Sequence, residues 1–196
     1  MSRSDAHPVF SGKTPEGEPR KGHRHAFFLP VDTNGDKHID HITVWAPEGF
    51  DSCAVRALQG LNKLWGGDGH PIRLILVGLG QAEEYRTAPS LSVATHWKSH
   101  TPFVLSRHPK RKRGEWTDTP EDQVRLACQR LLGVTPKVEH LPETRWSRFY
   151  RSRPGGGGSR ASDRGYGFRL EFPAPIAGPI ALGYGAHFGL GHFLPI

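Results

Sequence analysis

The chain has 196 residues, of which 36% are hydrophobic, and its 26 Lys and Arg against 19 Asp and Glu give a net charge of +7. Its longest apolar stretch, residues 72–79, contains an arginine and is far shorter than the ~20 residues of a membrane helix, which excludes a transmembrane protein. The length is enough for one large domain or two small ones.

The first 22 residues predict a disordered or linker-like tail, because they are rich in Pro, Gly, Ser and charged residues. They lack the apolar core of a secretory signal. The two cysteines, Cys53 and Cys128, are too few for a disulfide framework and have no CxxC spacing. We therefore expect a reducing, cytoplasmic location and no membrane partner.

The first half of the chain predicts two strands, a helix and a third strand. Residues 25–30 and 41–46 have strand patterns, and an Asn-Gly pair between them is a hairpin signal. Asp51 is placed to cap a helix that continues to about Trp65, before a Gly-Gly pair. Residues 72–79 are apolar at nearly every position, which favours a buried central strand.

The second half predicts the same order of elements. Strand-like pieces surround Val93 and Phe103, and a helix follows between Thr119 as its N-cap and Gly133 as its end. Its expected buried stripe consists of Val124, Ala127, Cys128 and Leu131. Two further strands are expected at residues 137–141 and 167–172, the second marked by alternation of apolar and polar residues.

Two successive strand–helix–strand units indicate an α+β fold made of tandem ferredoxin-like (RRM-like) units, with a glycine-rich loop at the C-terminal end. The expected organisation is a tail at residues 1–22, a first unit at 23–90 and a second unit at 91–196. No direct repeat of the sequence accompanies this duplication.

The positive charge is concentrated in the middle of the chain. Residues 98–164 contain 15 basic and 7 acidic residues, whereas the segments on either side are close to neutral. This asymmetry indicates a polyanionic partner, most simply a nucleic acid.

The glycine-rich segment 183–191, GYGAHFGLG, has two interpretations. Its glycines could bring backbone N–H groups close to a phosphate, or they could form a tight structural turn among packed aromatic rings. The segment matches neither a Walker loop nor a dinucleotide fingerprint.

Residues 178–191 resemble the C-terminal glycine-rich loop of the RAMP superfamily, the repeat-associated RNA-binding proteins of CRISPR systems. Residues 23–30 with 39–50, and 97–103 with 107–110, are similar to the RNA-processing half of the fused effector subunit of type I-G (formerly I-U) systems. The resemblance covers residues 21–196. It implies tandem ferredoxin-like folds and an endoribonuclease that cuts the repeat RNA of the precursor transcript and retains the product.

The chemistry that this resemblance implies needs no metal and no cofactor. A base deprotonates the 2′-hydroxyl beside the scissile phosphate, an acid protonates the leaving 5′-oxygen, and cations stabilise the developing charge. His25 is our principal acid/base candidate, with His41 and His187 as supporting candidates. His23 and His25 would share one face of a strand, and His41 would lie on the strand that pairs with it. His187 lies within the glycine-rich segment.

Two basic segments and the glycine-rich segment supply the candidate RNA contacts, because cations neutralise phosphates and aromatic rings stack on unpaired bases. The candidates are Lys98, Arg107, His108, Lys110, Arg111, Lys112, Arg113, Arg145, Trp146, Arg148, Tyr150, Arg151, Arg153, Gly183, Gly185, Gly189 and Gly191. The expected partners are CRISPR repeat RNA and other subunits of a type I effector complex.

Oxygen-bearing side chains alternate through residues 32–40, as in a calcium loop. Lys37 replaces the usual glycine and Thr43 the usual bidentate glutamate, so a plain hairpin turn is the stronger interpretation. A zinc site of His23, His25 and His41 has no supporting cysteine or HExxH pattern. A non-catalytic RNA-binding subunit and a histidine-coordinated metal hydrolase are the alternatives to the metal-independent nuclease.

Overall fold

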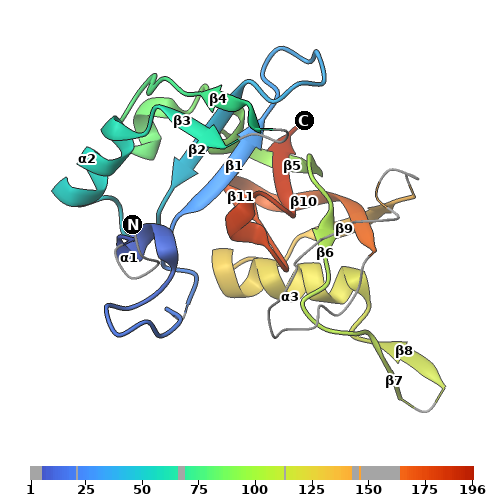
Figure 1. The fold of residues 1–196 in the computed structure, drawn as a ribbon. Coiled ribbons are helices and arrows are strands. Elements are labelled where there is room, and N and C mark those ends of the chain that lie inside the picture. The colour runs from blue at the N-terminus through green and yellow to red at the C-terminus, as the bar shows by residue number, and fades with distance from the viewer. Residues whose placement is uncertain (1–5, 21, 66–68, 113, 143–145, 147–163) are drawn as a thin grey trace. The chain divides into compact units, whose positions relative to one another are not determined.

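The computed structural model describes residues 6–20, 22–65, 69–112, 114–142, 146 and 164–196 (Figure 1). The chain forms two compact units. Unit 1 comprises Met1–Ala26 and Val44–Glu84, and unit 2 comprises Phe27–Thr43 and Tyr85–Ile196. This division differs from the expected boundary after residue 90, because residues 27–43 belong with the C-terminal part of the chain. The ring of Phe27 packs on that of His187, with 3.9 Å between their centroids.

A six-stranded antiparallel sheet forms the body of unit 2. Its strands lie in the order β11-β12-β5-β10-β6, and β9 also pairs with β10. The strands are β5 (Val93–Ser99), β6 (Phe103–Val104), β9 (Lys137–Leu141), β10 (Gly165–Ala177), β11 (Ile180–Ala181) and β12 (His192–Pro195). The strands expected around Val93 and Phe103 and at 137–141 and 167–172 are therefore confirmed, although β10 extends beyond its expected range.

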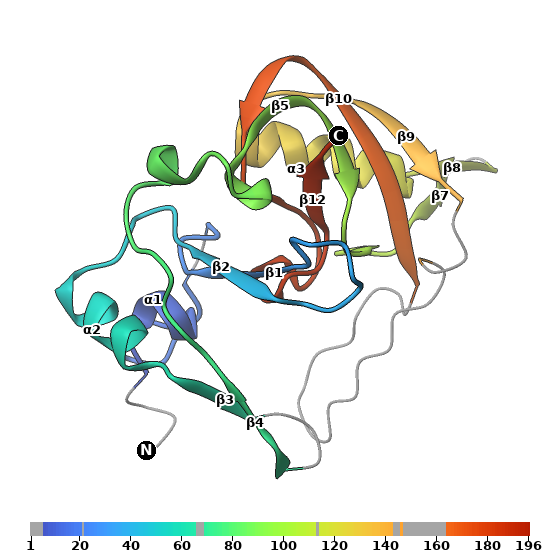
Figure 2. The ribbon, with the colours of Figure 1, turned by 90° about the horizontal axis from the view of Figure 1, so that it is seen from above.

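Helix α3 (Pro120–Leu132) covers one face of this sheet (Figure 2). Thr119 and Asp122 form a capping box at its start, and Gly133 ends it in the left-handed conformation, as predicted. Val124 and Cys128 are buried against Trp97, Phe168 and Leu170. Burial raises the pKa of the Cys128 thiol to about 12. Leu131, expected in the buried stripe, is 42% exposed.

The described part of unit 2 also contains two hairpins and two short 3₁₀ turns. Strands β1 (Phe27–Val31) and β2 (His41–Trp45) pair as the expected hairpin, with the last two residues of β2 in unit 1. Strands β7 (Lys110–Lys112) and β8 (Glu115–Thr117) form a second hairpin, which projects from the rest of unit 2 in Figures 1 and 2. Short 3₁₀ turns occupy Pro89–Leu91 and Ala186–Phe188.

Unit 1 contains the helices α1 (Pro8–Ser11) and α2 (Ser52–Gly60) and the paired strands β3 (Lys63–Trp65) and β4 (Pro71–Arg73). A 3₁₀ turn at Ala82–Tyr85 begins in unit 1, and its last residue belongs to unit 2. The Asp51 side chain caps α2 by accepting the N–H of Ala54 at 2.8 Å, as expected. The helix ends at Gly60 and not near Trp65, since residues 63–65 pair with β4.

The first 22 residues are not a tail without structure throughout, since α1 lies within them. Val9 is buried, and the ring of Phe10 stacks on that of Phe50 with 5.9 Å between centroids. The apolar contacts of these two residues explain why a segment with a linker-like composition folds.

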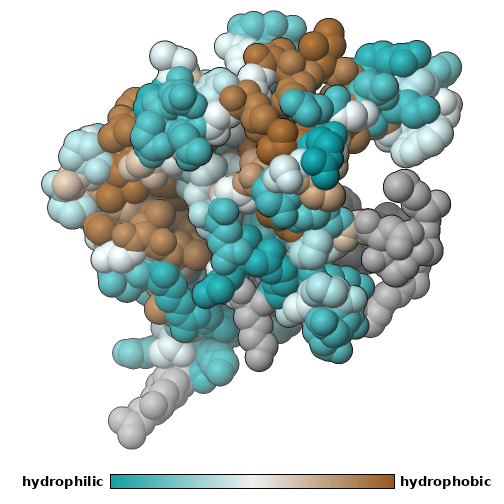
Figure 3. Space-filling view, turned by 90° about the vertical axis from the view of Figure 1, so that its left-hand side faces the viewer, coloured by the Kyte–Doolittle hydropathy of each residue, from teal (hydrophilic) through white to brown (hydrophobic). Residues whose placement is uncertain are grey.

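The prediction of a buried central strand at residues 72–79 is wrong. Strand β4 ends at Arg73 and pairs with β3 in a two-stranded sheet, and the side chains of Ile75 and Val77 are 86% and 79% exposed. Figure 3 views the side of the molecule that carries α2 and shows apolar residues, in brown, at the surface. The centre of the antiparallel sheet in unit 2 is instead occupied by β5 and β10.

The chain is thus a mixed α+β protein with antiparallel sheets. Among the helices that the structure describes, none has the length and apolar character required to cross a membrane.

Candidate functional site

The three candidate catalytic histidines lie in different surroundings. His25 belongs to unit 1 and precedes β1, and His23 before it has a φ of +54°, so the two do not share a strand face as expected. The His25 ring is half-buried against Gly12. Burial first, and then the positive charges of His23 and Arg20, lower the pKa of His25. A lowered pKa favours the neutral imidazole, which can accept a proton.

His41 and His187 both belong to unit 2. His41 is exposed, and its Nδ1 lies 3.0 Å from Asp40 Oδ1 and 3.3 Å from Thr33 Oγ1. His187 is 9% exposed and packs on Phe27. Of these two imidazoles, His41 is therefore the one that faces solvent, whereas His187 is part of the packing beneath β1.

The backbone N–H groups of the glycine-rich segment form hydrogen bonds mainly within the protein. The N–H groups of residues 184 and 188–191 donate to backbone carbonyls, among them Tyr184 to Val104 at 2.9 Å and Gly191 to Pro102 at 2.8 Å. Carbons added at Gly183, Gly185, Gly189 or Gly191 would meet atoms of Phe103, Leu190, Pro30 or Leu182. These contacts favour the structural turn over the phosphate cradle. Phe188 is 76% exposed, and sequence analysis missed it as an aromatic side chain open to a base.

Arg107, a candidate RNA contact, stabilises the base of the β7–β8 hairpin through side-chain hydrogen bonds. Its guanidinium donates two hydrogen bonds to the carboxylate of Asp118, which follows β8. Gln123 of α3 donates to the backbone carbonyls of both residues, at 2.9 Å and 3.2 Å. A bidentate Arg–carboxylate pair has a fixed geometry, so this contact holds the two ends of the hairpin together.

The β7–β8 hairpin carries a cation and an aromatic ring on one face. Arg111 and Trp116 are directly opposite in the antiparallel register, and the guanidinium carbon lies 4.8 Å from the centroid of the indole. Trp116 is 59% exposed, and His108 and Lys110 are exposed as well. Lys112 lies on the same strand. An exposed Arg–Trp pair on a basic hairpin is a typical surface for contact with phosphates and bases.

The second basic segment, residues 145–153, lies mostly outside the described residues, and so does Arg113 at the end of the first basic segment, residues 107–113. The candidates of the second segment that lie outside the described residues are Arg145, Arg148, Tyr150, Arg151 and Arg153. Trp146 is described and is 4% exposed, packed against Gly165 and Gly167 of β10. Its indole fills the space beside Gly167 and its backbone carbonyl lies against Gly165, so little of the ring is open to a stacking base.

Lys98 lines a hollow in unit 2 that sequence analysis did not detect. The hollow has a volume of about 490 Å³ and is formed by the connection between β1 and β2, the end of β5 and residues 194–196. Its basic and titratable members are Lys37, His38, Lys98 and His100. The signal that could have found them is weak, since the four residues come from two segments about sixty positions apart.

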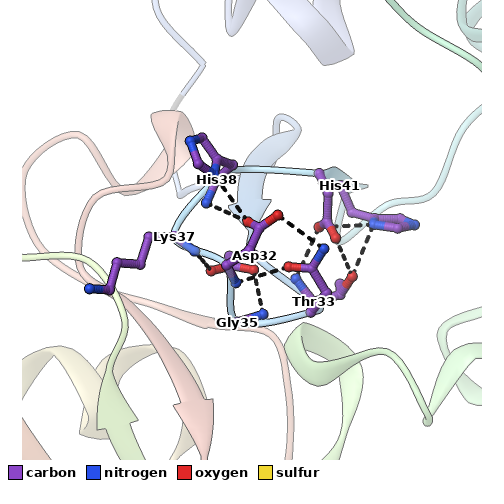
Figure 4. Close-up of polar contacts among 9 residues, drawn as sticks. Asp32, Thr33, Gly35, Lys37, His38 and His41 are labelled. Carbon is purple, nitrogen blue, oxygen red and sulfur yellow. Dashed lines mark hydrogen bonds and ion pairs between the residues drawn. The ribbon is translucent and has the colours of Figure 1, made fainter.

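The connection between β1 and β2 is organised by its own carboxylates (Figure 4). Asp32 accepts the N–H groups of Gly35 and Lys37, each at 2.7 Å, and Lys37 has a φ of +71°. Hydrogen bonds from Thr33 and His41 hold the pKa of Asp40 well below its usual range. Among the described residues, no group of three or more His, Cys, Asp or Glu side chains is arranged to hold a metal ion.

The architecture and the site thus define a mixed α+β protein with a basic, partly aromatic surface on unit 2. Comparison with known protein families, with curated proteins and with solved structures finds no match.

Proposed function

We propose that this protein is a metal-independent endoribonuclease of the RAMP type that cleaves CRISPR repeat RNA and retains the product. The observation that carries the proposal is the braced β7–β8 hairpin, where Arg111 and the exposed Trp116 stand together in the most basic part of the chain. The proposed fold is a tandem of ferredoxin-like units, for which the antiparallel sheet of unit 2 and its covering helix provide partial support.

The reaction proceeds by attack of a ribose 2′-oxygen on the adjacent phosphorus. A neutral histidine takes the proton of the 2′-hydroxyl, the phosphorus–O5′ bond breaks, and a protonated histidine gives its proton to O5′. The products are a 2′,3′-cyclic phosphate and a 5′-hydroxyl, so neither water nor a redox partner is consumed. Lys or Arg stabilises the charge that develops on the phosphoryl oxygens.

The surroundings of the candidate histidines support different roles. The lowered pKa of His25 suits a base, and the exposed His41, held by Asp40, suits a group that meets the RNA directly. The buried position of His187 supports a packing role.

Labelled repeat RNA should be cleaved at an unchanged rate in excess EDTA, because none of the proton transfers needs a metal. The products, separated on a denaturing gel, should carry a 2′,3′-cyclic phosphate. Complete inhibition by EDTA would favour the metal hydrolase. Tight binding without cleavage would favour the second candidate function, a non-catalytic RNA-binding subunit, which the same basic hairpin supports.

Replacing Trp116 with Ala should weaken the binding of single-stranded repeat RNA by about 5- to 150-fold, the loss expected when one base–aromatic stack is removed. Fluorescence anisotropy with labelled RNA measures this change. Trp65→Ala is a matched control, because Trp65 is 83% exposed and has Lys63 5.3 Å from its ring, on the β3 strand of unit 1. Equal losses in the two variants would contradict a specific role for the hairpin.

A further inference from the structure

Residues 75–79, which follow β4 in unit 1, are an apolar segment without a pairing strand among the described residues. Their sequence is Ile-Leu-Val-Gly-Leu, and the side chains of Ile75 and Val77 are 86% and 79% exposed. Leu76 and Leu79 are each 44% exposed. In Figure 2 the segment continues β4 as a long connection that is neither helix nor strand. Apolar side chains are therefore open to solvent along the whole segment.

The backbone of the same segment also has no partner in the described part of the chain. The N–H of Leu74 donates to the carbonyl of Asn62 at 2.9 Å, which extends the β3–β4 pairing by one residue. Beyond it, no described residue donates a hydrogen bond to residues 75–79 or accepts one from them. Free N–H and C=O groups on an apolar strand are a template for pairing with another strand.

We infer that residues 71–79 form a dimerisation strand, which pairs in antiparallel register with the same residues of a second copy of this chain. This interface goes beyond the proposed function. A pairing centred on Leu76 places Ile75 opposite the partner's Val77, and by symmetry Val77 opposite the partner's Ile75. Directly opposite side chains lie on the same face with about 4.5–5.5 Å between their Cβ atoms. The two most exposed side chains of the segment are thus complementary to each other.

The charges of the strand are also compatible with a second copy. Arg73 is the one charged residue between positions 71 and 79. In the register centred on Leu76, it lies opposite the partner's Leu79, and the two arginines are about 20 Å apart along the strands. This separation exceeds the Debye length of about 8 Å at physiological ionic strength, so their repulsion is screened. The strand carries no pattern of charges that would select a different protein.

Dimerisation would also enlarge a sheet that is small in the single chain. Strands β3 and β4 form a sheet of two strands, and an isolated pair of strands is marginally stable in water. In the dimer, β3 lies on one side of residues 71–79 and the partner's strand lies on the other. The combined sheet then has four strands, and Ile72, which is 55% exposed, joins Leu76 on its second face.

Charges exchanged across the pair test the register. Ile75→Glu and Val77→Lys should each weaken dimerisation by at least about 10-fold, because a symmetric interface receives each new charge twice. The variant with both substitutions should dimerise more tightly than either single variant, since each new carboxylate then faces an ammonium group of the partner. Ile39→Glu is the matched control, because Ile39 is 66% exposed in unit 2 and should leave dimerisation unchanged.

Sedimentation equilibrium of the full chain without RNA measures the dissociation constants, and urea unfolding shows whether each variant is folded. In the unmodified protein, hydrogen exchange of the amides of residues 75–79 should slow as the dimer forms. A monomer at every concentration, aggregates without a defined size, or a double variant weaker than both single variants would overturn the inference. These measurements contain no RNA, so their failure leaves the proposed nuclease standing, and absence of RNA cleavage leaves the dimer standing.

Discussion

Lowering the pH from 7 to 4.5 should cost the folded protein about 3 kcal/mol of unfolding free energy through His192 alone. His192 is 0% exposed in β12, and burial, followed by the charge of His100, lowers its pKa to about 3. The backbone of Pro30 acts on this pKa in the opposite direction. The imidazole is therefore neutral in the folded protein at every pH in this range.

Acid lowers the stability because the unfolded state binds a proton on His192 and the folded state does not. In the unfolded chain His192 has its ordinary pKa of about 6.5 and is protonated below that pH. In the folded chain the same imidazole stays neutral. The contribution to stability is complete above about pH 6.5 and falls by about 1.4 kcal/mol per pH unit until the folded pKa near 3 is reached. The lowered pKa of His25 acts in the same direction.

Urea unfolding followed by tryptophan fluorescence at pH 7 and pH 4.5 measures this effect. His192→Leu removes the titrating group and should flatten the pH dependence, whereas His96→Ala, an exposed histidine in β5, should preserve it. An unchanged pH dependence in His192→Leu would show that another group controls acid stability.

Local signals allowed α3 to be predicted from the sequence almost completely. Its start depends on the Thr119 cap and a proline at the first helical position, and its end on Gly133, all within the helix and its flanks. The position of residues 72–79 could not be predicted in the same way. An apolar run indicates strand character, but the choice of a partner strand depends on residues far away in the chain.

Strand β10 illustrates the opposite case. Alternation identified only residues 167–172, since Pro173 and Pro175 interrupt the strand pattern. The structure tolerates both prolines because the pairing of β10 with β5 is irregular between Glu171 and Ile176. The length of β10 was therefore underestimated, because the irregular pairing with β5 that accommodates the prolines cannot be predicted from the sequence of β10 alone.

The candidate site was predictable in composition but not in geometry. A run of basic residues identifies the β7–β8 region, yet the sequence does not show that Arg107 is paired with Asp118 while Arg111 lies on Trp116. The hollow corresponds to no local sequence pattern, since Lys37 and Lys98 lie far apart in the sequence and line the same space only in the folded chain.

Gly191→Ala should destabilise the protein by about 2–5 kcal/mol, because two costs combine at this position. Gly191 has a φ of +58°, where an alanine costs about 1–2 kcal/mol. Its added carbon would also overlap the carbonyl oxygen of Leu182, and overpacking of this kind costs about 1–3 kcal/mol. The backbone cannot easily retreat, since Gly191 donates to the Pro102 carbonyl and accepts from Leu182, at 2.8 Å and 2.9 Å.

Gly133→Ala is the matched control, because Gly133 has a φ of +72° and no atom within 4 Å of the added carbon. Gly133→Ala should lower the free energy of unfolding only by the cost of a positive φ, about 1–2 kcal/mol. The difference between the two variants in urea unfolding therefore measures the cost of the steric overlap in the glycine-rich segment. RNA affinity then separates the two interpretations of that segment. A structural turn predicts that the folded fraction of Gly191→Ala binds repeat RNA as the wild type does. A phosphate cradle predicts normal stability and lost affinity, and that result would restore Gly191 to the RNA-binding surface.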